Sequence, residues 1–358
     1  MSELLSPQEL SPQERLDLLR TLSELPPSVF AEIRIGIGAH KSLLPREDAS
    51  SKRRAIALFD WAMSPIGPGE IALKQLADSV IEHYRENLVL PTSEDDDQIQ
   101  GQPIRLELLN GAPLDLVHIP AGYFLMGSLG DEPDREASEG PQHPVTVSEF
   151  YLSTCVVTQA QWSAVALMAK IDVPLLQCPS LREGSVGDVS QSGDHPVENI
   201  SWYEAVEFCN RITTALHQSE QYRSSHCRLP TEAEWEYACR AGSQTRYCFG
   251  DTITPGQVNY AGAVGQTTPV GAYACNDFGL FDMHGNVWEW CLDPWHESYG
   301  GAPYDGSVWA QNGRDEYRVI RGGSWFNEAR HCRSAYRNCL SPEDRSAQLG
   351  FRIVLAHD

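Results

Sequence analysis

The stretch RGGSWFNEARHCRSAYRN, from Arg321 to Asn338, places one cysteine among arginines, aromatic residues and small polar residues near the end of the chain. A thiolate can act as a nucleophile or bind a soft metal ion, so Cys332 is a candidate for chemistry. A free cysteine is also among the most commonly buried residues, and in that role it only packs. The surrounding side chains would then be available to recognise a ligand. These two possibilities separate an enzyme from a binding protein.

The other cysteines do not form a familiar metal or redox motif. The chain contains ten cysteines, the first of which is Cys155, and no two of them have the CxxC spacing. The usual zinc and dithiol patterns are therefore absent from the sequence. We expect most of these cysteines to be small buried residues.

Length, composition and charge limit the domain organisation and the partners. A chain of 358 residues with 41% hydrophobic residues predicts two globular domains. The formal charge of -22 argues against nucleic acid and against anionic membranes, because both need Lys and Arg to neutralise phosphates. The first residues contain neither a basic nor a long apolar segment, and no apolar run of membrane-spanning length follows. The expected location is cytoplasmic.

Residues 1–87 predict a small helical bundle, because apolar residues recur at helical spacing in four segments that prolines separate. The expected apolar faces consist of Leu16, Leu18, Leu19, Leu22 and Leu25 in the first helix, Ile56, Phe59 and Met63 in the third, and Leu73, Leu76, Val80 and Tyr84 in the fourth. The run from Leu58 to Tyr84 resembles the death-like, effector-associated adaptor domains of bacterial conflict systems. That resemblance implies a protein partner with a similar adaptor domain, and the alternative is a generic bundle. Residues 88–103 combine proline with an acidic run and predict a linker.

Residues 104–358 have a different composition, with many glycines, tryptophans and short apolar segments. Short strands are expected on both sides of Pro120-Ala121-Gly122, and one strand is expected over residues 145–153. Three helix starts carry the capping-box pattern, in which a hydroxyl residue is followed three positions later by Glu or Gln. These pairs are Thr158 with Gln161, Ser201 with Glu204 and Thr231 with Glu234. The core is expected to contain Trp202, Trp235, Trp288 and Trp290.

Four motifs of this second segment, in order, make it similar to the formylglycine-generating enzyme, or sulfatase-modifying factor, superfamily. They are HPVENISWYEAVEFCNRI from His195, CRLPTEAEWEYACRAG from Cys227, GLFDMHGNVWEWCLD from Gly279, and RVIRGGSW from Arg318 followed by LGFRIV ending at Val354. The resemblance implies a C-type-lectin-like α+β fold with much irregular structure. It does not imply catalysis, because this fold carries oxidases, iron-dependent sulfur-transfer enzymes and pure binding proteins.

The oxidases of that superfamily bind copper through two cysteines that lie five residues apart, shortly after the GGS turn. In this sequence Asn327 occupies the first of these places. Cys332 lies five residues further on, whereas alignment from the LGFR end puts Ala329 at the second place. A lone thiol does not make the two-thiolate site, so neither catalytic residues nor bound copper are expected. The alternative function is an oxygen- or metal-dependent oxidoreductase with an altered active site.

The variable proteins of diversity-generating retroelements offer a closer resemblance. Their terminal region reads approximately RVxRGGSW, CRSAxR and LGFR, with fixed scaffold residues between randomised ones, and here it spans about residues 318–352. The scaffold places hold Arg318, Val319, Arg321 to Trp325, Cys332 to Ala335, Arg337, and Leu349 to Arg352. The remaining places hold a chemically scattered set, called the variable positions below: Phe326, Asn327, Glu328, Arg330, His331, Tyr336, Cys339, Leu340, Asp344, Ser346, Ala347 and Gln348.

This resemblance implies a non-catalytic protein that displays a diversified surface to an unknown protein or other macromolecular ligand. Cys332 is then a packed scaffold residue, while Arg333 and Arg337 are expected to hold loops through forked hydrogen bonds to carbonyl groups. The alternative is an undiversified member of the superfamily whose last loop only covers the core.

The superfamily also implies a structural calcium site around the GNVWEW turn. The matching positions are Asp282, the backbone carbonyls of Gly285 and Val287, and Glu289. Oxygen ligands of this mixed origin suit calcium. The alternative is that both carboxylates bond to nearby amides or arginines. A second family site would use Asn259, Tyr260, Gly271 and Tyr273, but Gly271 replaces the expected carboxylate, so this site is expected to be lost.

Overall fold

The computed structural model describes residues 10–24, 30, 33–34, 51–63, 72–75, 77–78, 102–108, 111–180 and 193–357. Most of the predicted linker, residues 88–103, lies outside these ranges, as do Leu25, Leu76, Val80 and Tyr84. Among the described residues, no helix is both long enough and apolar enough to cross a membrane.

The N-terminal helices α1 (Pro12–Glu24) and α3 (Ser51–Ala62) pack against each other, and both lie where the sequence predicts helices. The Ser11 hydroxyl accepts a hydrogen bond from the Glu14 amide at 3.3 Å, and the Glu14 carboxylate accepts one from the Ser11 amide, which caps α1. The buried side chains are Leu18, Leu22, Phe30, Ile33, Ala55, Leu58, Ala62, Leu73 and Ala77.

The predicted apolar face of α3 is wrong at Ile56 and Met63, whereas Phe59 packs against the buried cluster as predicted. Ile56 and Met63 are 42% and 47% exposed, while the neighbouring stripe of Ala55, Leu58 and Ala62 is buried. Both stripes have helical spacing, so the sequence alone does not choose between them. Small alanine side chains allow α1 to approach α3 closely, which favours the stripe that the structure buries.

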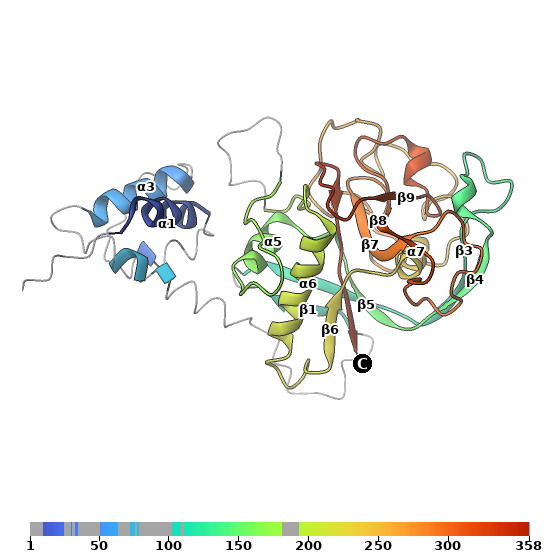
Figure 1. Cartoon of the computed structure of the whole chain (residues 1–358). Coiled ribbons are helices and arrows are strands. Elements are labelled where there is room, and N and C mark those ends of the chain that lie inside the picture. Colours follow the sequence, from blue (N-terminus) through green and yellow to red (C-terminus); the bar gives the residue numbers. More distant parts are fainter. Residues whose placement is uncertain are drawn as a thin grey trace, which may run out of the picture.

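The described residues of the C-terminal body form three β-sheets, which Figure 1 shows beside helices α5, α6 and α7. The five-stranded sheet has the order β1 (Ile104–Glu107), β2 (Pro113–Ile119), β5 (Phe150–Ser153), β11 (Val354–His357) and β6 (Ser225–Arg228). The four-stranded sheet has the order β10 (Leu349–Gly350), β7 (Trp288–Trp295), β8 (Arg314–Arg321) and β9 (Arg337–Leu340). The third sheet pairs β3 (Gly122–Met126) with β4 (His143–Val147). All neighbouring strands are antiparallel except β10 and β7.

The single strand predicted over residues 145–153 is in fact two strands in different sheets. Strand β4 ends at Val147 and β5 begins at Phe150. Ser148 and Glu149 are both exposed, which interrupts the alternation of buried and exposed residues between the two strands. The chain changes sheet at this point.

The three predicted capping boxes are confirmed. They begin α5 (Gln159–Ala166), α6 (Trp202–Leu216) and α7 (Glu232–Arg240), and in each one the side chains of the hydroxyl residue and of the third helical residue bond to each other's backbone amide. Short 3-10 helices, η3 (Ala137–Glu139) and η5 (Ala329–Cys332), lie in the loops. Every residue of α7 is buried, so its carboxylates need partners inside the protein.

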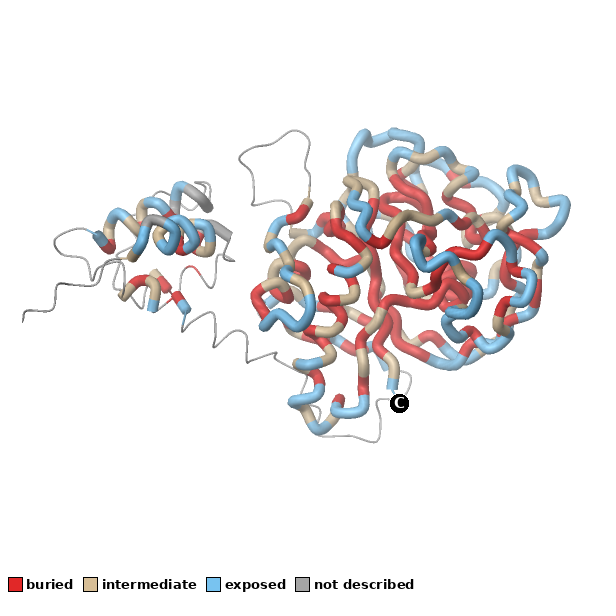
Figure 2. Tube along the Cα trace, viewed as in Figure 1, coloured by how far each residue is buried: buried red, intermediate tan, exposed pale blue. Residues whose placement is uncertain are grey.

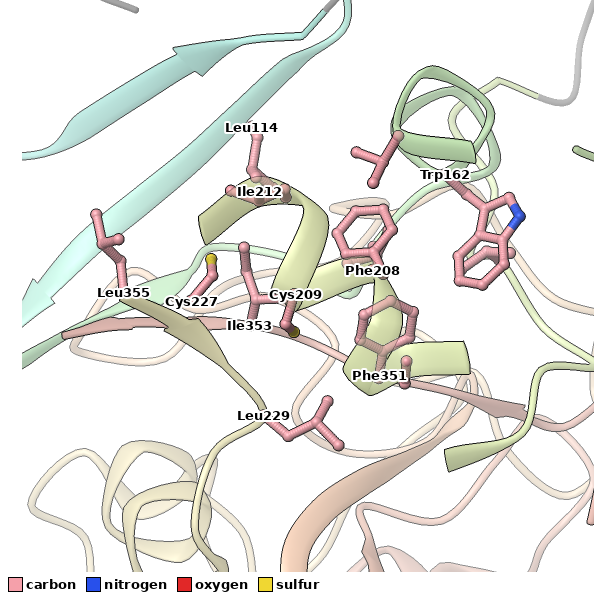
Figure 3. Close-up of a cluster of buried hydrophobic side chains, with 14 of the residues drawn as sticks. Leu114, Trp162, Phe208, Cys209, Ile212, Cys227, Leu229, Phe351, Ile353 and Leu355 are labelled. Carbon is pink, nitrogen blue, oxygen red and sulfur yellow. The ribbon is translucent and has the colours of Figure 1, made fainter. Parts of the chain in front are cut away.

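The core is rich in aromatic side chains, as expected from the sequence. Trp235 and Trp290 are fully buried, Trp288 is 6% exposed, and Trp202 is only partly buried. Trp162 was not predicted as a core residue, and it stacks on Phe208 with ring centroids 5.7 Å apart. Figure 3 shows both rings beside Phe351, and Figure 2 shows how buried segments run through the centre of this body.

The cap of α5 gives a test of this local architecture. The Thr158 hydroxyl accepts a hydrogen bond from the Gln161 amide at 3.2 Å. Replacing Thr158 by Ala should lower the free energy of unfolding by about 1 kcal/mol, because this amide then loses its partner. Replacing Thr158 by Ser keeps the hydroxyl and should restore most of the loss. Urea denaturation measures both variants, and equal losses in the two would contradict the capping role.

Candidate ligand-binding surface

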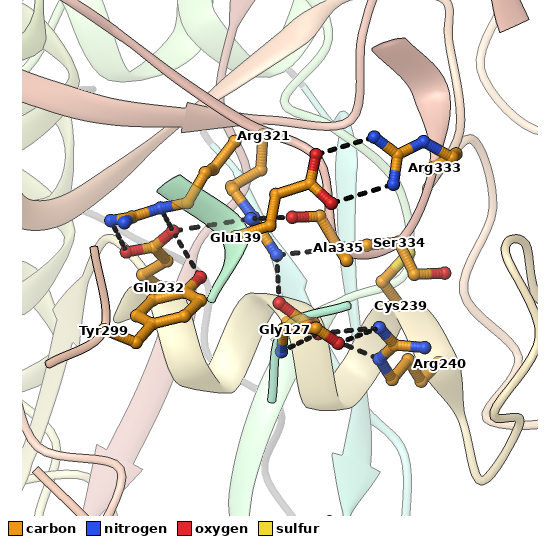
Figure 4. Close-up of polar contacts among 12 residues, drawn as sticks. Gly127, Glu139, Glu232, Cys239, Arg240, Tyr299, Arg321, Arg333, Ser334 and Ala335 are labelled. Atoms are coloured by element: carbon orange, nitrogen blue, oxygen red, sulfur yellow. Dashed lines mark hydrogen bonds and ion pairs between the residues drawn. The ribbon is translucent and has the colours of Figure 1, made fainter. Parts of the chain in front are cut away.

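Buried arginines hold the C-terminal segment from inside. Arg321, at the end of β8, is fully buried and donates to the Glu236 carboxylate of α7. The same guanidinium donates to the carbonyls of Ser334 and Ala335 at 2.9 and 3.1 Å. Figure 4 shows Arg321 reaching from the sheet to α7. This side chain therefore ties β8, α7 and the segment before β9 together.

Arg333 and Arg337 make similar forked contacts. Arg333 donates to both oxygens of Glu139 at 2.8 and 2.6 Å and to the Asp134 carbonyl at 2.7 Å. Arg337 donates to both oxygens of Glu232, each at 2.7 Å. Its Nη1 atom also donates to the carbonyls of Ser138 and His296. The predicted bonds from Arg333 and Arg337 to carbonyl groups are confirmed. Their carboxylate partners, Glu139 and Glu232, were not predicted from the sequence.

The positive charges also stabilise ionised carboxylates in the interior. Burial alone would raise the pKa of Glu236, but Arg240 and Arg321 outweigh it and hold this pKa below its ordinary value. The sequence of α7 indicates that its carboxylates need cationic partners. Glu232 and Glu236 lie four residues apart on a helix whose apolar residues predict burial, so both carboxylates required cationic partners.

Cys332 is a packed residue, as the scaffold interpretation predicts. Its side chain is fully buried, and burial raises the pKa of the thiol to about 12. Gly323 lies against it with φ of +74°, and a Cβ atom on Gly323 would be 2.5 Å from the sulfur. Glycine is therefore required for the GGS turn to close over this cysteine. Cys332 remains protonated at neutral pH and is a poor nucleophile.

The variable positions contrast with the scaffold positions in burial. None of them is buried, and Phe326 is 62% exposed. Of the scaffold residues, only Arg318 and Trp325 are not fully buried. The division that the sequence pattern predicts therefore coincides with a division between surface and interior.

Several variable positions gather around Trp288 at the start of β7. The Trp288 indole donates to the Asn327 side chain at 2.9 Å, and the Tyr336 ring lies 6.0 Å from the Trp288 ring. His331 contacts Tyr336 with ring centroids 5.0 Å apart. The Ser324 hydroxyl lies 2.6 Å from the Asn327 side-chain oxygen and 2.8 Å from the Gln348 side-chain oxygen and can donate to either, which brings the two ends of the segment together. The Trp325 ring contacts the Phe326 ring, with centroids 5.7 Å apart, and the Trp325 indole N–H donates to the Ala347 carbonyl at 3.3 Å.

Other variable positions lie apart from this group. Leu340 and Tyr336 pack against the core cluster that contains Trp288, whereas Cys339 packs against the cluster on the opposite side of β9. Alternation along the strand produces this separation, because successive side chains point to opposite faces. Asp344 accepts a hydrogen bond from the Ser341 amide within an exposed turn. The name ligand surface is used below for Phe326, Asn327, His331, Tyr336, Leu340 and Gln348.

The place of the first copper-binding cysteine belongs to this surface. Asn327 occupies it, and its side-chain oxygen is bonded to Trp288 and Ser324. The second place falls on buried Cys332 or on Ala329, according to the alignment chosen. Within the described ranges, no three His, Cys, Asp or Glu side chains come together in a way that could hold a metal ion.

The carboxylates at the predicted calcium positions make hydrogen bonds and an ion pair within the chain. Arg352 donates to both oxygens of Glu289 at 2.6 and 2.9 Å, and the Trp235 indole donates to the same carboxylate. Asp282 accepts a hydrogen bond from the Gly271 amide at 2.8 Å. Burial raises the pKa of Asp282 to about 6. The Arg352 guanidinium thus neutralises Glu289. These are the contacts that the amide-and-arginine alternative expects, and calcium binding at this turn stays a prediction.

The geometry defines a C-type-lectin-like α+β domain with an ion-paired interior and a partly exposed, aromatic sheet face. Residues 110–357 match the family described as sulfatase-modifying factor enzyme 1-like domain. The chain belongs to this family.

Relatives with different names share the domain. The chain is 31% identical over 299 residues to the formylglycine-generating enzyme of Thermomonospora curvata, covering 67% of this chain and 92% of that one. It is also 31% identical over 267 residues to hercynine oxygenase of Mycolicibacterium thermoresistibile, covering 64% and 56% of the two chains. Enzymes therefore occur among its sequence relatives.

Similar solved structures include PvdO from Pseudomonas aeruginosa, with a TM-score of 0.57, 32% identity, and coverage of 68% of this chain and 94% of that one. Variable protein 1 of Treponema denticola has a TM-score of 0.56 and 27% identity, with coverage of 68% and 95%. Family membership is thus compatible with both functions considered from the sequence, and the residues of this chain must decide between them.

Two arginines three residues apart test the separation of scaffold and surface. Replacing Arg333 by Ala should destabilise the domain by about 3–5 kcal/mol, because Glu139 then remains buried without its cation. Arg330 is exposed and pairs only with exposed Glu328, so Arg330→Ala should change stability by less than about 0.5 kcal/mol. Urea denaturation compares the two variants, and losses of similar size would overturn the division.

Calcium removal tests the role of Arg352. Because this guanidinium already neutralises Glu289, a calcium chelator should shift the melting temperature by no more than about 1 °C. Differential scanning fluorimetry with and without added calcium makes the measurement. A drop of several degrees on chelation, reversed by calcium, would show that the site forms around an ion after all.

Proposed function

We propose that this protein is a non-catalytic ligand-binding protein that displays a diversified surface on its C-type-lectin-like domain. One observation carries the proposal: the variable positions are exposed or partly exposed, while the scaffold residues other than Arg318 and Trp325 are buried, and four buried arginines among them pair with buried glutamates. A rigid interior of this kind tolerates replacement of the exposed side chains, as antibody frameworks do. The likeness to variable protein 1 of Treponema denticola supports the same function.

The composition of the ligand surface suits a macromolecular ligand. Phe326, His331 and Tyr336 present aromatic rings, which dominate the energy of many protein interfaces. Asn327 and Gln348 supply amide groups that bond in either direction. In this proposal the N-terminal helices recruit a protein with a similar adaptor domain, and the protein acts in the cytoplasm.

The gene itself provides the first test of diversification. A near-duplicate of the DNA that encodes Arg318 to Arg352 is expected close to the gene, beside a reverse-transcriptase reading frame. The two copies should differ mainly at adenines in codons for the variable positions. Codons for the scaffold positions should be the same in both copies, because nearly all of them encode buried residues. Sequencing the downstream DNA decides the matter. Absence of any such copy would remove the main support for a diversified surface.

The enzyme relatives give a second candidate function, an oxidoreductase that binds copper through Cys332. Burial and the raised pKa of this thiol argue against it. Copper(I) titration in competition with a chromogenic chelator should give the same weak binding for the natural chain and for Cys332→Ser. Tight binding of one copper ion that is lost in Cys332→Ser would favour the enzyme instead.

A further inference from the structure

A charged residue of the scaffold lies beside the ligand surface without a counter-charge. Arg318 of β8 pairs in register with Leu340 of β9, and partners opposite each other in antiparallel strands point to the same face of the sheet. Ile320, two residues further along β8, is buried in the same core cluster against which Leu340 and Tyr336 pack. Arg318 is therefore on the same face as Leu340 and Tyr336.

The electrostatic situation of Arg318 differs from that of the buried arginines. Arg321, Arg333, Arg337 and Arg352 each pair with a buried glutamate. Arg318 is half-buried, its Nε atom is shielded from solvent, and this atom has no hydrogen-bond acceptor among the described residues. None of the ion pairs formed by the described part of the chain includes Arg318. A partly exposed guanidinium without an ion pair attracts an anion that reaches its exposed part.

Trp202 fixes the position of this guanidinium. The Arg318 guanidinium carbon lies 4.6 Å from the centroid of a Trp202 ring, in a cation–π contact. The Trp202 indole donates to the Cys291 carbonyl at 2.8 Å, and the Trp202 amide donates to the Pro342 carbonyl at 3.0 Å. The ring is therefore held between β7 and the loop that follows β9. A guanidinium held in this way loses little freedom when it binds an anion.

We infer that Arg318 and Trp202 form a fixed subsite for a carboxylate group, and that the ligand surface takes acidic protein segments that carry a Glu or Asp beside an apolar residue. This inference rests on the proposed function and names the chemistry of its ligand. The planar fork of Arg matches a carboxylate, which can bond to two N–H groups at once. The subsite belongs to the scaffold, so it stays the same while the variable positions around it change.

Nearby charges favour a carboxylate over a more highly charged phosphate group. Glu204, two residues after Trp202, accepts a hydrogen bond from Arg345, and exposed Glu343 and Asp344 follow Leu340 closely in the chain. The whole chain carries a formal charge of -22. A single negative charge gains the bond to Arg318 with less repulsion from these groups than a dianion does.

A random peptide library displayed on phage provides the probe. The library is selected on the immobilised full-length chain, and the selected peptides are synthesised and measured by fluorescence anisotropy. We expect an acidic residue at a constant distance from an apolar one in the selected peptides. Replacing Arg318 by Met keeps an unbranched, apolar side chain over Trp202 but removes the donors, and it should weaken binding about tenfold or more. Arg314→Met is the matched control, because it removes an exposed guanidinium of the same strand that already has Glu297 as a partner.

The outcomes separate this inference from the proposed function. If peptides without acidic residues bind and Arg318→Met leaves their affinity unchanged, the carboxylate subsite is wrong. In that case, loss of binding in the triple variant Phe326→Ala, His331→Ala, Tyr336→Ala would still support the ligand surface. If neither Arg318→Met nor the triple variant weakens binding, or if no peptide is enriched, both are overturned. An unchanged melting temperature in Arg318→Met shows that any weakening comes from the lost donors and not from unfolding.

Discussion

The structure depends on arginine–glutamate pairs that are buried in the C-terminal domain. The segment from Arg321 to Arg352 contains little regular structure, so its backbone carbonyls need donors from elsewhere. Guanidinium groups supply them, as Arg333 and Arg337 do by bonding to carbonyls and to a carboxylate at the same time. Without these guanidinium groups, both the carbonyls of the loops and the carboxylates of α7 would lack hydrogen-bond partners. Each pair is costly to break, because the remaining partner is a buried charge.

This arrangement separates the residues that hold the fold from the exposed variable positions. The ion pairs fix the backbone on both sides of the loop at residues 324–331 without using its exposed side chains. Phe326 and Glu328 can therefore change with little effect on stability, whereas Arg333, only a few residues away, cannot. A surface of this kind tolerates many sequences, since its shape comes from the interior and its chemistry from the exposed positions.

Local features were predictable from the sequence, and features that depend on distant contacts were not. The helix caps at Thr158, Ser201 and Thr231 are confirmed because a capping box involves residues only three positions apart. The prediction of the apolar face of α3 was wrong at Ile56 and Met63, because packing against α1 decides which stripe of the helix is buried. The partners of Arg333 were missed because Glu139 lies almost 200 residues earlier in the chain. The burial of Cys332 followed from the motif, whereas the separation of Cys339 from Leu340 required the strand register.

The same logic explains how one fold accommodates catalysis and binding. The copper-binding places of the enzymes correspond here to Asn327, on the ligand surface, and to either Ala329 or Cys332. The arginine–glutamate pairs do not involve Asn327 or Ala329, so the side chains at these places can differ while the scaffold stays the same. Cys332 illustrates the opposite case, because the GGS turn closes over its sulfur and no space remains for a larger group. A cysteine retained for packing is thus distinguished from one retained for chemistry by its burial and its high pKa.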